Sequence, residues 1–301
     1  MLYFERVKTN MTNQPRNINK NKEIITNSKM SVTLKDMELA YQIFGDGETI
    51  ILCFHGHGRS SEDFKFLSRP NRKIISIDLF LHGDSTFDHS RIYKDLIALE
   101  HVEKLLENLF LKEKIDQFHL VAYSQGGRFT LSLFPRFAER VLSLNLIAPD
   151  GINDTNFYSW SQRRWWARSL FKRWVNRPQE LMSIAKALAQ AKIIRPKIID
   201  FLNYYTADQK RLQLAHATWR GFRKLRPSNE LIKSSVIEHK TPFQLIIGKY
   251  DQIITSKSAR AFLKSINQQD ALVEIPFGHD LFKPHIENKL FHLLDFESFE
   301  K

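Results

Sequence analysis

Short apolar segments that alternate with helix-like segments constrain the fold of this 301-residue chain more than any other feature. Four runs of mostly apolar residues are each long enough for one buried strand: residues 49–54, 73–78, 117–123 and 141–147. Two segments between or after these runs, residues 92–110 and 128–137, are predicted as helices. Continuous apolar strands separated by helices predict an α/β fold, with a mostly parallel central sheet covered by helices on both faces.

The segment before this pattern divides into two parts. Residues 38–44 also read as a strand, and only the turn Gly45-Asp46-Gly47 separates them from residues 49–54, so we expect the two strands to lie side by side. Residues 1–30 are polar, basic and rich in asparagine. We expect them to form a disordered lead-in to the folded domain.

The middle of the chain differs from its flanks in composition. Residues 152–235 contain 17 lysines and arginines against 5 aspartates and glutamates, which accounts for the whole net charge of +12. All five tryptophans lie in the same stretch: Trp160, Trp165, Trp166, Trp174 and Trp219. This composition indicates a separate structural unit.

The pattern of secondary structure changes over the same stretch. Four helices are predicted in succession, at residues 161–175, 178–192, 196–205 and 208–224, before the strand pattern resumes near residue 241. The sequence therefore predicts an α/β core at residues 31–151 and 236–301, with an all-helical insertion at residues 152–235.

One predicted strand ends in a motif that makes a hydroxyl group nucleophilic. The run Leu120-Val121-Ala122-Tyr123 leads into Ser124, and Gln125-Gly126-Gly127 then opens a predicted helix. A strand-to-helix turn of this kind is so sharp that only small neighbours fit, and it exposes the serine at the end of a buried strand. The strict pattern has glycine where Ala122 stands, but alanine is also small.

An acid and a histidine follow two later strands. Asp251 comes after residues 243–248, and His279 comes after residues 271–276. Because sites in open parallel sheets gather at the carboxyl ends of the strands, we expect Ser124, Asp251 and His279 to converge. His279 would take the proton of the serine hydroxyl, and Asp251 would orient the imidazole. Asp150 is a rival acid, although its Pro-Asp-Gly setting is more typical of a turn.

From about residue 31 to its end, the chain resembles the α/β-hydrolase fold family, in the group with a helical cap. Besides the three residues above, the resemblance rests on His55-Gly56-His57-Gly58-Arg59-Ser60 and on Asp78-Leu79-Phe80-Leu81-His82-Gly83-Asp84-Ser85. Relatives usually have glycine where Leu81 stands, so we expect a difference in that loop. The resemblance implies that the helical insertion roofs the active site. It also implies an oxyanion hole formed by the backbone N–H groups of His57 and Gln125.

The identity of the nucleophile narrows the reaction. Serine favours acyl transfer to water, so we expect a carboxylic ester hydrolase that works through an acyl-enzyme intermediate. We expect the substrate pocket to be lined by His55, Tyr123, Trp160 and Trp165. A thioesterase, a lysolipid hydrolase or a hydrolase of activated carbon–carbon bonds would use the same triad. A non-catalytic protein of this fold that docks on a membrane or a protein partner is a further alternative.

No cofactor or metal ion is expected, because the sequence has no Walker pattern and no cluster with metal-ligand spacing apart from the loop histidines. Bases and aromatic residues interleave over residues 157–174. They suit an interfacial helix on an anionic membrane, a roof that guides an anionic substrate, or a cap that buries its rings and leaves its bases in water. No motif indicates nucleic-acid binding.

Location is predicted from what the sequence lacks. Its one cysteine, Cys53, lies in an apolar strand and rules out an internal disulfide, and the sequence contains no apolar stretch typical of a signal peptide or a membrane span. We therefore expect a cytoplasmic protein, with peripheral membrane contact as the alternative.

Overall fold

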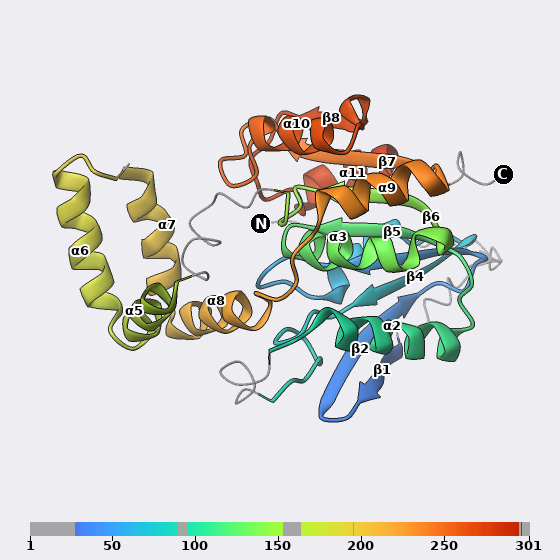
Figure 1. Ribbon diagram of the computed structural model, residues 1–301, viewed down its shortest axis with the longest axis horizontal. Coiled ribbons are helices and arrows are strands. Elements are labelled where there is room, and N and C mark those ends of the chain that lie inside the picture. The colour runs from blue at the N-terminus through green and yellow to red at the C-terminus, as the bar shows by residue number, and fades with distance from the viewer. Residues whose placement is uncertain (1–27, 89–95, 153–163, 195, 295, 297–301) are drawn as a thin grey trace, which may run out of the picture.

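The computed structural model describes residues 28–88, 96–152, 164–194, 196–294 and 296. Within these residues, one sheet of eight strands has the order β1-β2-β4-β3-β5-β6-β7-β8 (Figure 1). The strands are β1 (Ser28–Leu34), β2 (Met37–Phe44), β3 (Thr49–Phe54), β4 (Arg72–Ile77), β5 (Phe118–Tyr123), β6 (Val141–Ile147), β7 (Phe243–Gly248) and β8 (Leu272–Ile275). The pairs β1–β2 and β2–β4 are antiparallel, and all other pairs are parallel. The predicted mostly parallel sheet is confirmed.

The prediction that the second and third strands are neighbours is wrong, because β4 lies between β2 and β3. The connection at residues 45–48 passes over the start of β4 instead of forming a hairpin. The N–H of Gly47 donates to the carbonyl of Arg72, and the N–H of Thr49 donates to the carbonyl of Asn71. A Cβ atom on Gly47 would lie 2.0 Å from the Asn71 carbonyl carbon, so only glycine allows this crossing.

Side chains of successive strand residues point to opposite faces of the sheet and build two apolar clusters. Leu52 and Phe54 of β3 belong to the cluster that α2 (Leu99–Glu113), α3 (Gln125–Phe137), α9 (Asn229–His239) and α10 (Ser256–Ser265) cover. Ile51 and Cys53 belong to the cluster on the other face, beneath η1 (Ser61–Leu67) and α11 (Pro284–Leu293). Two short turns, η2 (Ala138–Arg140) and η3 (Gln269–Ala271), connect elements of this core.

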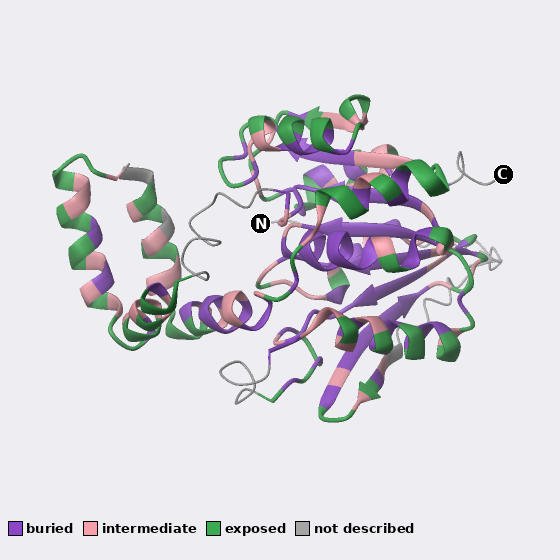
Figure 2. Cartoon of the chain, viewed as in Figure 1, coloured by how far each residue is buried: buried purple, intermediate pink, exposed green. Residues whose placement is uncertain are grey.

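Four helices between β6 and β7 lie to one side of the sheet, at the left of Figure 1. They are α5 (Trp165–Asn176), α6 (Pro178–Gln190), α7 (Pro196–Thr206) and α8 (Gln209–Gly221). Neighbouring helices of this group contact one another, and α5 also contacts α8. We refer to residues 164–226 as the cap. Figure 2 shows that α5, α6 and α7 have mainly exposed and half-buried residues, in contrast to the sheet.

The start of the sheet and the position of α9 differ from the boundaries predicted from the sequence. Strand β1 begins at Ser28, inside the segment expected to be a disordered lead-in, and residues 1–27 lie outside the described part. Helix α9 packs on α3 and η2, so it lies with the core, and the predicted boundary at residue 235 falls within this helix. No helix among the described residues is long and apolar enough to cross a bilayer.

Candidate active site

Ser124 occupies a strained turn between β5 and α3. Its backbone angles are φ +46° and ψ −114°, a conformation that costs a residue other than glycine about 1–3 kcal/mol. Three backbone hydrogen bonds hold it there. The N–H of Ser124 donates to the Ile147 carbonyl at 3.0 Å, and the Ser124 carbonyl accepts from Gly127 at 2.9 Å and from Asp150 at 2.6 Å. The surrounding strands and helix therefore fix the position of the hydroxyl group.

The two glycines after Ser124 are required by close packing. A Cβ atom on Gly126 would lie 2.2 Å from the carbonyl oxygen of Phe54, and one on Gly127 would lie 2.4 Å from Cβ of Pro149. Real Cβ atoms do not approach other atoms this closely. Helix α3 can therefore start directly at the end of the sheet, which is the geometry that the motif predicts.

The structure brings Ser124, His279 and Asp251 together in one hydrogen-bonded chain. Oγ of Ser124 lies 3.0 Å from Nε2 of His279, and Nδ1 of His279 lies 2.7 Å from Oδ2 of Asp251. The other carboxylate oxygen, Oδ1, accepts from the N–H groups of Ile253 at 2.7 Å and Ile254 at 2.9 Å. The Asp251 side chain is fully buried, so its orientation is fixed on both sides.

Contacts with neighbouring segments hold the loop that carries His279. A Cβ atom on Gly248 would lie 2.2 Å from the carbonyl oxygen of Gly278, so the end of β7 and this loop are in close contact. The hydroxyl of Tyr123 donates to the His279 carbonyl at 3.0 Å. The rings of Tyr123 and His279 stack with centroids 5.8 Å apart. Tyr123, the residue before Ser124, therefore supports His279 directly.

Asp150, the rival acid, is engaged elsewhere. Its two carboxylate oxygens accept hydrogen bonds from Nε and a terminal nitrogen of Arg128, at 2.7 and 2.9 Å. The Arg128 side chain is buried, and it also donates to the carbonyl of Leu225 at the end of the cap at 3.1 Å. Asp150 therefore pairs with Arg128, whereas Asp251 pairs with the histidine.

The expectation that His55 lines the substrate pocket is wrong, because this residue is fully buried below the loop. Its Nε2 accepts a hydrogen bond from the N–H of Leu79 at 2.9 Å, and its Nδ1 donates to the carbonyl of Gly56 at 2.7 Å. Burial, and secondarily the neighbouring His82, lowers the pKa of His55 to about 3. A neutral His55 thus ties together the two loops named in the resemblance.

In the second of these loops, a leucine stands at the position where relatives usually have glycine. Leu81 has φ +67°, so it adopts the left-handed conformation that glycine favours at this position. The carboxylate of Asp78 closes the loop by accepting from the N–H groups of Ser61 at 2.7 Å and Asp84 at 3.2 Å. Gly83 must remain a glycine, since its Cβ would lie 2.1 Å from the Asp78 carboxylate.

A pocket of about 920 Å³ lies between this rim and the cap, and Ser124 and His279 are in its wall. His57, Gln125 and Tyr123 also line it. The cap contributes residues from α7, α8 and the segment between them, most of them aromatic or basic: Tyr204, Tyr205, Asp208, Lys210, Arg211, Leu214 and Trp219.

The tryptophans chosen from the sequence were a poor guide to this pocket. Trp165 is 75% exposed at the start of α5 and does not line the pocket, so that prediction is wrong. Trp160 lies outside the described residues. Trp219 lines the pocket instead, together with Tyr205. Both belong to predicted helices, but the sequence alone did not show which face of each helix meets the core.

His57 connects the loop after β3 with the cap. Its Nδ1 lies 3.5 Å from Oγ1 of Thr218 in α8, and its ring lies beside that of Tyr205, with centroids 6.1 Å apart. Burial, and then the nearby His82, lowers the pKa of His57 to about 4. Its neutral ring thus forms part of the contact between the core loop and the cap.

The chain matches a family model described as the alpha/beta hydrolase fold over residues 49–285. The chain belongs to the alpha/beta hydrolase fold family. One similar curated protein is the dihydrolipoyllysine-residue acetyltransferase component of an acetoin cleaving system from Pseudomonas putida. The two sequences are 27% identical over 224 residues, and this alignment covers 73% of the chain and 56% of that protein. Over 141 residues it is 28% identical to the probable lysophospholipase BODYGUARD 5 from Arabidopsis thaliana, covering 44% of the chain and 31% of that protein.

This hydrolase-fold chain therefore spans about half or less of the length of these curated relatives. Solved structures match it over nearly their full length. A thermophilic esterase from Thermogutta terrifontis has a TM-score of 0.62 at 17% identity, covering 88% of the chain and 96% of the esterase. A bacterial membrane phospholipase A has a TM-score of 0.56 at 17% identity, covering 91% and 85%. At these identities the likeness shows the fold alone.

Proposed function

We propose that this protein is a serine hydrolase that cleaves a carboxylic ester through an acyl-enzyme intermediate. One observation carries the proposal: an unbroken hydrogen-bonded chain runs from the Ser124 hydroxyl through His279 to the buried Asp251 carboxylate. The hydroxyl end of this chain lies in the wall of a pocket large enough for a small ester. The broader assignment as a hydrolase also agrees with two similar proteins, one named as an esterase and the other as a probable lysophospholipase.

In the proposed reaction, Oγ of Ser124 attacks the ester carbonyl carbon while Nε2 of His279 takes the hydroxyl proton. The carbonyl oxygen becomes an oxyanion, and we assign its stabilisation to the backbone N–H groups of Gln125 and His57, which both line the pocket. The carbon–oxygen bond to the leaving group then breaks, and His279 protonates the alcohol. Water attacks the acyl-enzyme by the same steps, which releases the carboxylic acid and restores Ser124.

Active-site labelling tests this proposal. A fluorophosphonate probe should label the parent protein and fail to label Ser124→Ala, whereas the exposed-serine control Ser234→Ala should be labelled like the parent. Hydrolysis of p-nitrophenyl esters should fall by about 10⁶-fold in kcat for Ser124→Ala. Equal labelling of the parent protein and Ser124→Ala would refute the assigned nucleophile.

The same geometry serves other acyl substrates, and the names of the relatives favour a lysolipid ester as the second candidate. The sequence match to a probable lysophospholipase covers 44% of this chain. A panel of esters, thioesters and lysophospholipids of graded acyl length would distinguish the candidates by kcat/KM. A thioester preference of more than about tenfold would replace the ester proposal with a thioesterase. If the pure protein neither reacts with the probe nor turns over any of these substrates, the non-catalytic alternative is favoured.

A further inference from the structure

Helix α5 of the cap has an exposed face that combines tryptophan with basic residues. Six exposed residues of α5 share this face: Trp165, Trp166, Ser169, Lys172, Arg173 and Asn176. The spacing of Trp165, Ser169 and Lys172 places them one helical turn apart on the same side. The opposite side of the helix buries Ala167 and Val175 against the rest of the cap. We refer to the six exposed residues as the α5 face.

The α5 face exposes large apolar groups that a water-facing helix does not require. Trp165 is 75% exposed and Trp166 is 40% exposed. Single exposed apolar residues are common on protein surfaces, but a pair of tryptophans at one helix start is unusual. Indole rings are enriched where a protein meets the headgroup region of a bilayer, because they offer both an apolar surface and an N–H donor.

Positive charge surrounds these rings. Residues 164–226 contain 15 lysines and arginines against 3 acidic residues, and α5 itself has no acidic residue. Two of the three acids have a local role: Glu180 accepts from Arg173, and Asp208 caps the start of α8. The electrostatic field of the cap is therefore strongly positive and would attract an anionic surface.

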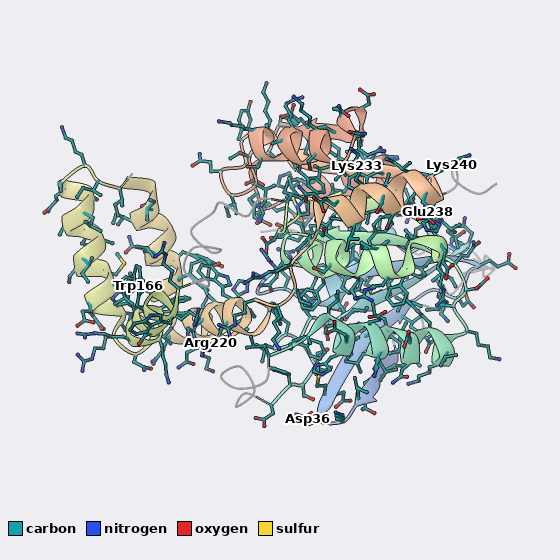
Figure 3. The ribbon with its side chains drawn as sticks, in the orientation of Figure 1. Asp36, Trp166, Arg220, Lys233, Glu238 and Lys240 are labelled. Atoms are coloured by element: carbon teal, nitrogen blue, oxygen red, sulfur yellow. The ribbon has the colours of Figure 1, made fainter. Side chains whose placement is uncertain are left out.

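The basic side chains next to α5 are crowded. Burial, followed by the positive charges of Arg168, Arg220 and Arg226, lowers the pKa of Arg223. Burial lowers the pKa of His216 to about 4, and the charges of Arg220 and Lys172 add to this effect. Figure 3 shows Trp166 and Arg220 on the cap, whereas Lys233 lies on α9 and Lys240 directly follows this helix. A layer of phosphate groups against the cap would relieve the repulsion between these cations.

We propose that the α5 face docks on anionic lipid bilayers, with Trp165 at the depth of the headgroups and Lys172 facing the lipid phosphates. The combination of exposed indole rings and positive charge on one amphipathic helix is typical of binding in the plane of a membrane surface. Docking in this way does not depend on the proposed catalytic activity.

Vesicle flotation of the full chain tests the proposal. The parent protein should float with phosphatidylcholine vesicles that contain phosphatidylserine, and much less with pure phosphatidylcholine vesicles. Trp165→Ala combined with Lys172→Gln and Arg173→Gln should weaken binding by at least about tenfold, since each basic residue near an anionic surface contributes roughly a fivefold factor. Added salt should weaken parent binding further, because it screens the attraction.

Matched controls separate the α5 face from general surface properties. Leu111→Ala removes an equally exposed apolar side chain from α2, and Lys233→Gln removes one positive charge from α9 over the sheet. Both controls should bind vesicles like the parent protein. Circular dichroism and thermal melting would verify that every variant is folded, so that lost binding is not mistaken for unfolding.

Three outcomes would overturn the proposal. One is parent-like binding of the triple variant, and another is equal binding to charged and uncharged vesicles. The third is binding to a fluorescent oligonucleotide with no binding to vesicles, which would assign the positive surface to a nucleic acid. A blue shift of the tryptophan emission on vesicle binding that is lost in Trp165→Phe would support the predicted depth of the ring.

Discussion

The core and the cap of this molecule are packed in opposite ways. Eleven of the twelve largest fully buried side chains lie outside the cap, and the cap contributes only Phe222. Helices α5 and α6 bury just four side chains, all small or medium-sized: Ala167, Val175, Leu181 and Ala185. Conversely, six of the eleven exposed large apolar residues among the described residues are in the cap.

The densely packed core and the loosely packed cap contribute different groups to the site. Groups that must be held in a fixed geometry, such as Ser124 and Asp251, lie in the densely packed part, whose close contacts resist displacement. Tyr205, which lines the pocket, lies in α7, in the loosely packed outer part of the cap. Regions with few buried apolar contacts open at lower free energy, so we infer that the cap controls access without disturbing the triad.

The largest effect is expected in the core. Asp251→Asn should lower kcat by about 10⁴-fold with little change in KM, because the amide no longer fixes and stabilises the histidine. Asp150→Asn is the matched control, since it alters an acid on the same rim that pairs with Arg128. Steady-state kinetics of both variants would test the assignment. A greater loss of kcat in Asp150→Asn would mean that the wrong acid has been assigned.

A substitution at the contact between core and cap should change the stability of the protein. The buried side chain of Arg128 connects α3 to Asp150 before the cap and to Leu225 at its end. Arg128→Met should reduce the free energy of unfolding by about 3–5 kcal/mol, because it leaves a carboxylate without its partner. The double variant Arg128→Met with Asp150→Asn should recover part of that loss in urea unfolding. If the double variant is no more stable than Arg128→Met, the pair does not have this role.

A smaller loss of stability is expected from the close contact between Gly126 and β3. Gly126→Ala should destabilise the protein by about 1–3 kcal/mol, because the new methyl group would meet the Phe54 carbonyl oxygen at 2.2 Å. Gly278→Ala is the control, since no atom lies within 4 Å of its added Cβ. Thermal melting of both variants would measure the difference. A melting temperature of Gly126→Ala equal to that of the control would show that the close packing around the nucleophile is overstated.

The smallest expected effect is on how the stability of the protein changes with pH. The pKa of His55 is lowered to about 3, below the value near 6.5 of an unfolded histidine. Its contribution to stability is therefore fully present above pH 6.5 and is lost as the pH falls towards the folded value. Below pH 6.5 this loss approaches about 1.4 kcal/mol for each pH unit. Urea unfolding between pH 7 and pH 5 should show a flatter pH dependence for His55→Gln than for the parent protein, and identical slopes would contradict the prediction.

The sequence predicted those parts of the site that depend on local order along the chain. Ser124, Asp251 and His279 each follow a buried apolar run, and such runs are visible in the sequence because they are continuous. The sharp turn at Ser124 was likewise predictable, since glycines mark the places where backbones approach closely. The parallel sheet followed from the same alternation of apolar runs and helices.

What the sequence did not predict depends on contacts between distant segments. The place of β4 between β2 and β3 is set by pairing across the sheet, which a short glycine turn does not reveal. The choice between Trp165 and Trp219 as a pocket residue depends on how each helix is rotated against its neighbours. The role of His55 depends on Leu79, which accompanies it only in the folded protein.

Cys53 has a practical consequence. It is the one cysteine in the sequence, its side chain is fully buried in β3, and burial raises the pKa of its thiol well above the usual value. Since the thiolate is the reactive form, maleimide reagents should leave it untouched. A single Trp165→Cys substitution would thus give one attachment point for a fluorophore, and the cap could be tracked without removing any native thiol.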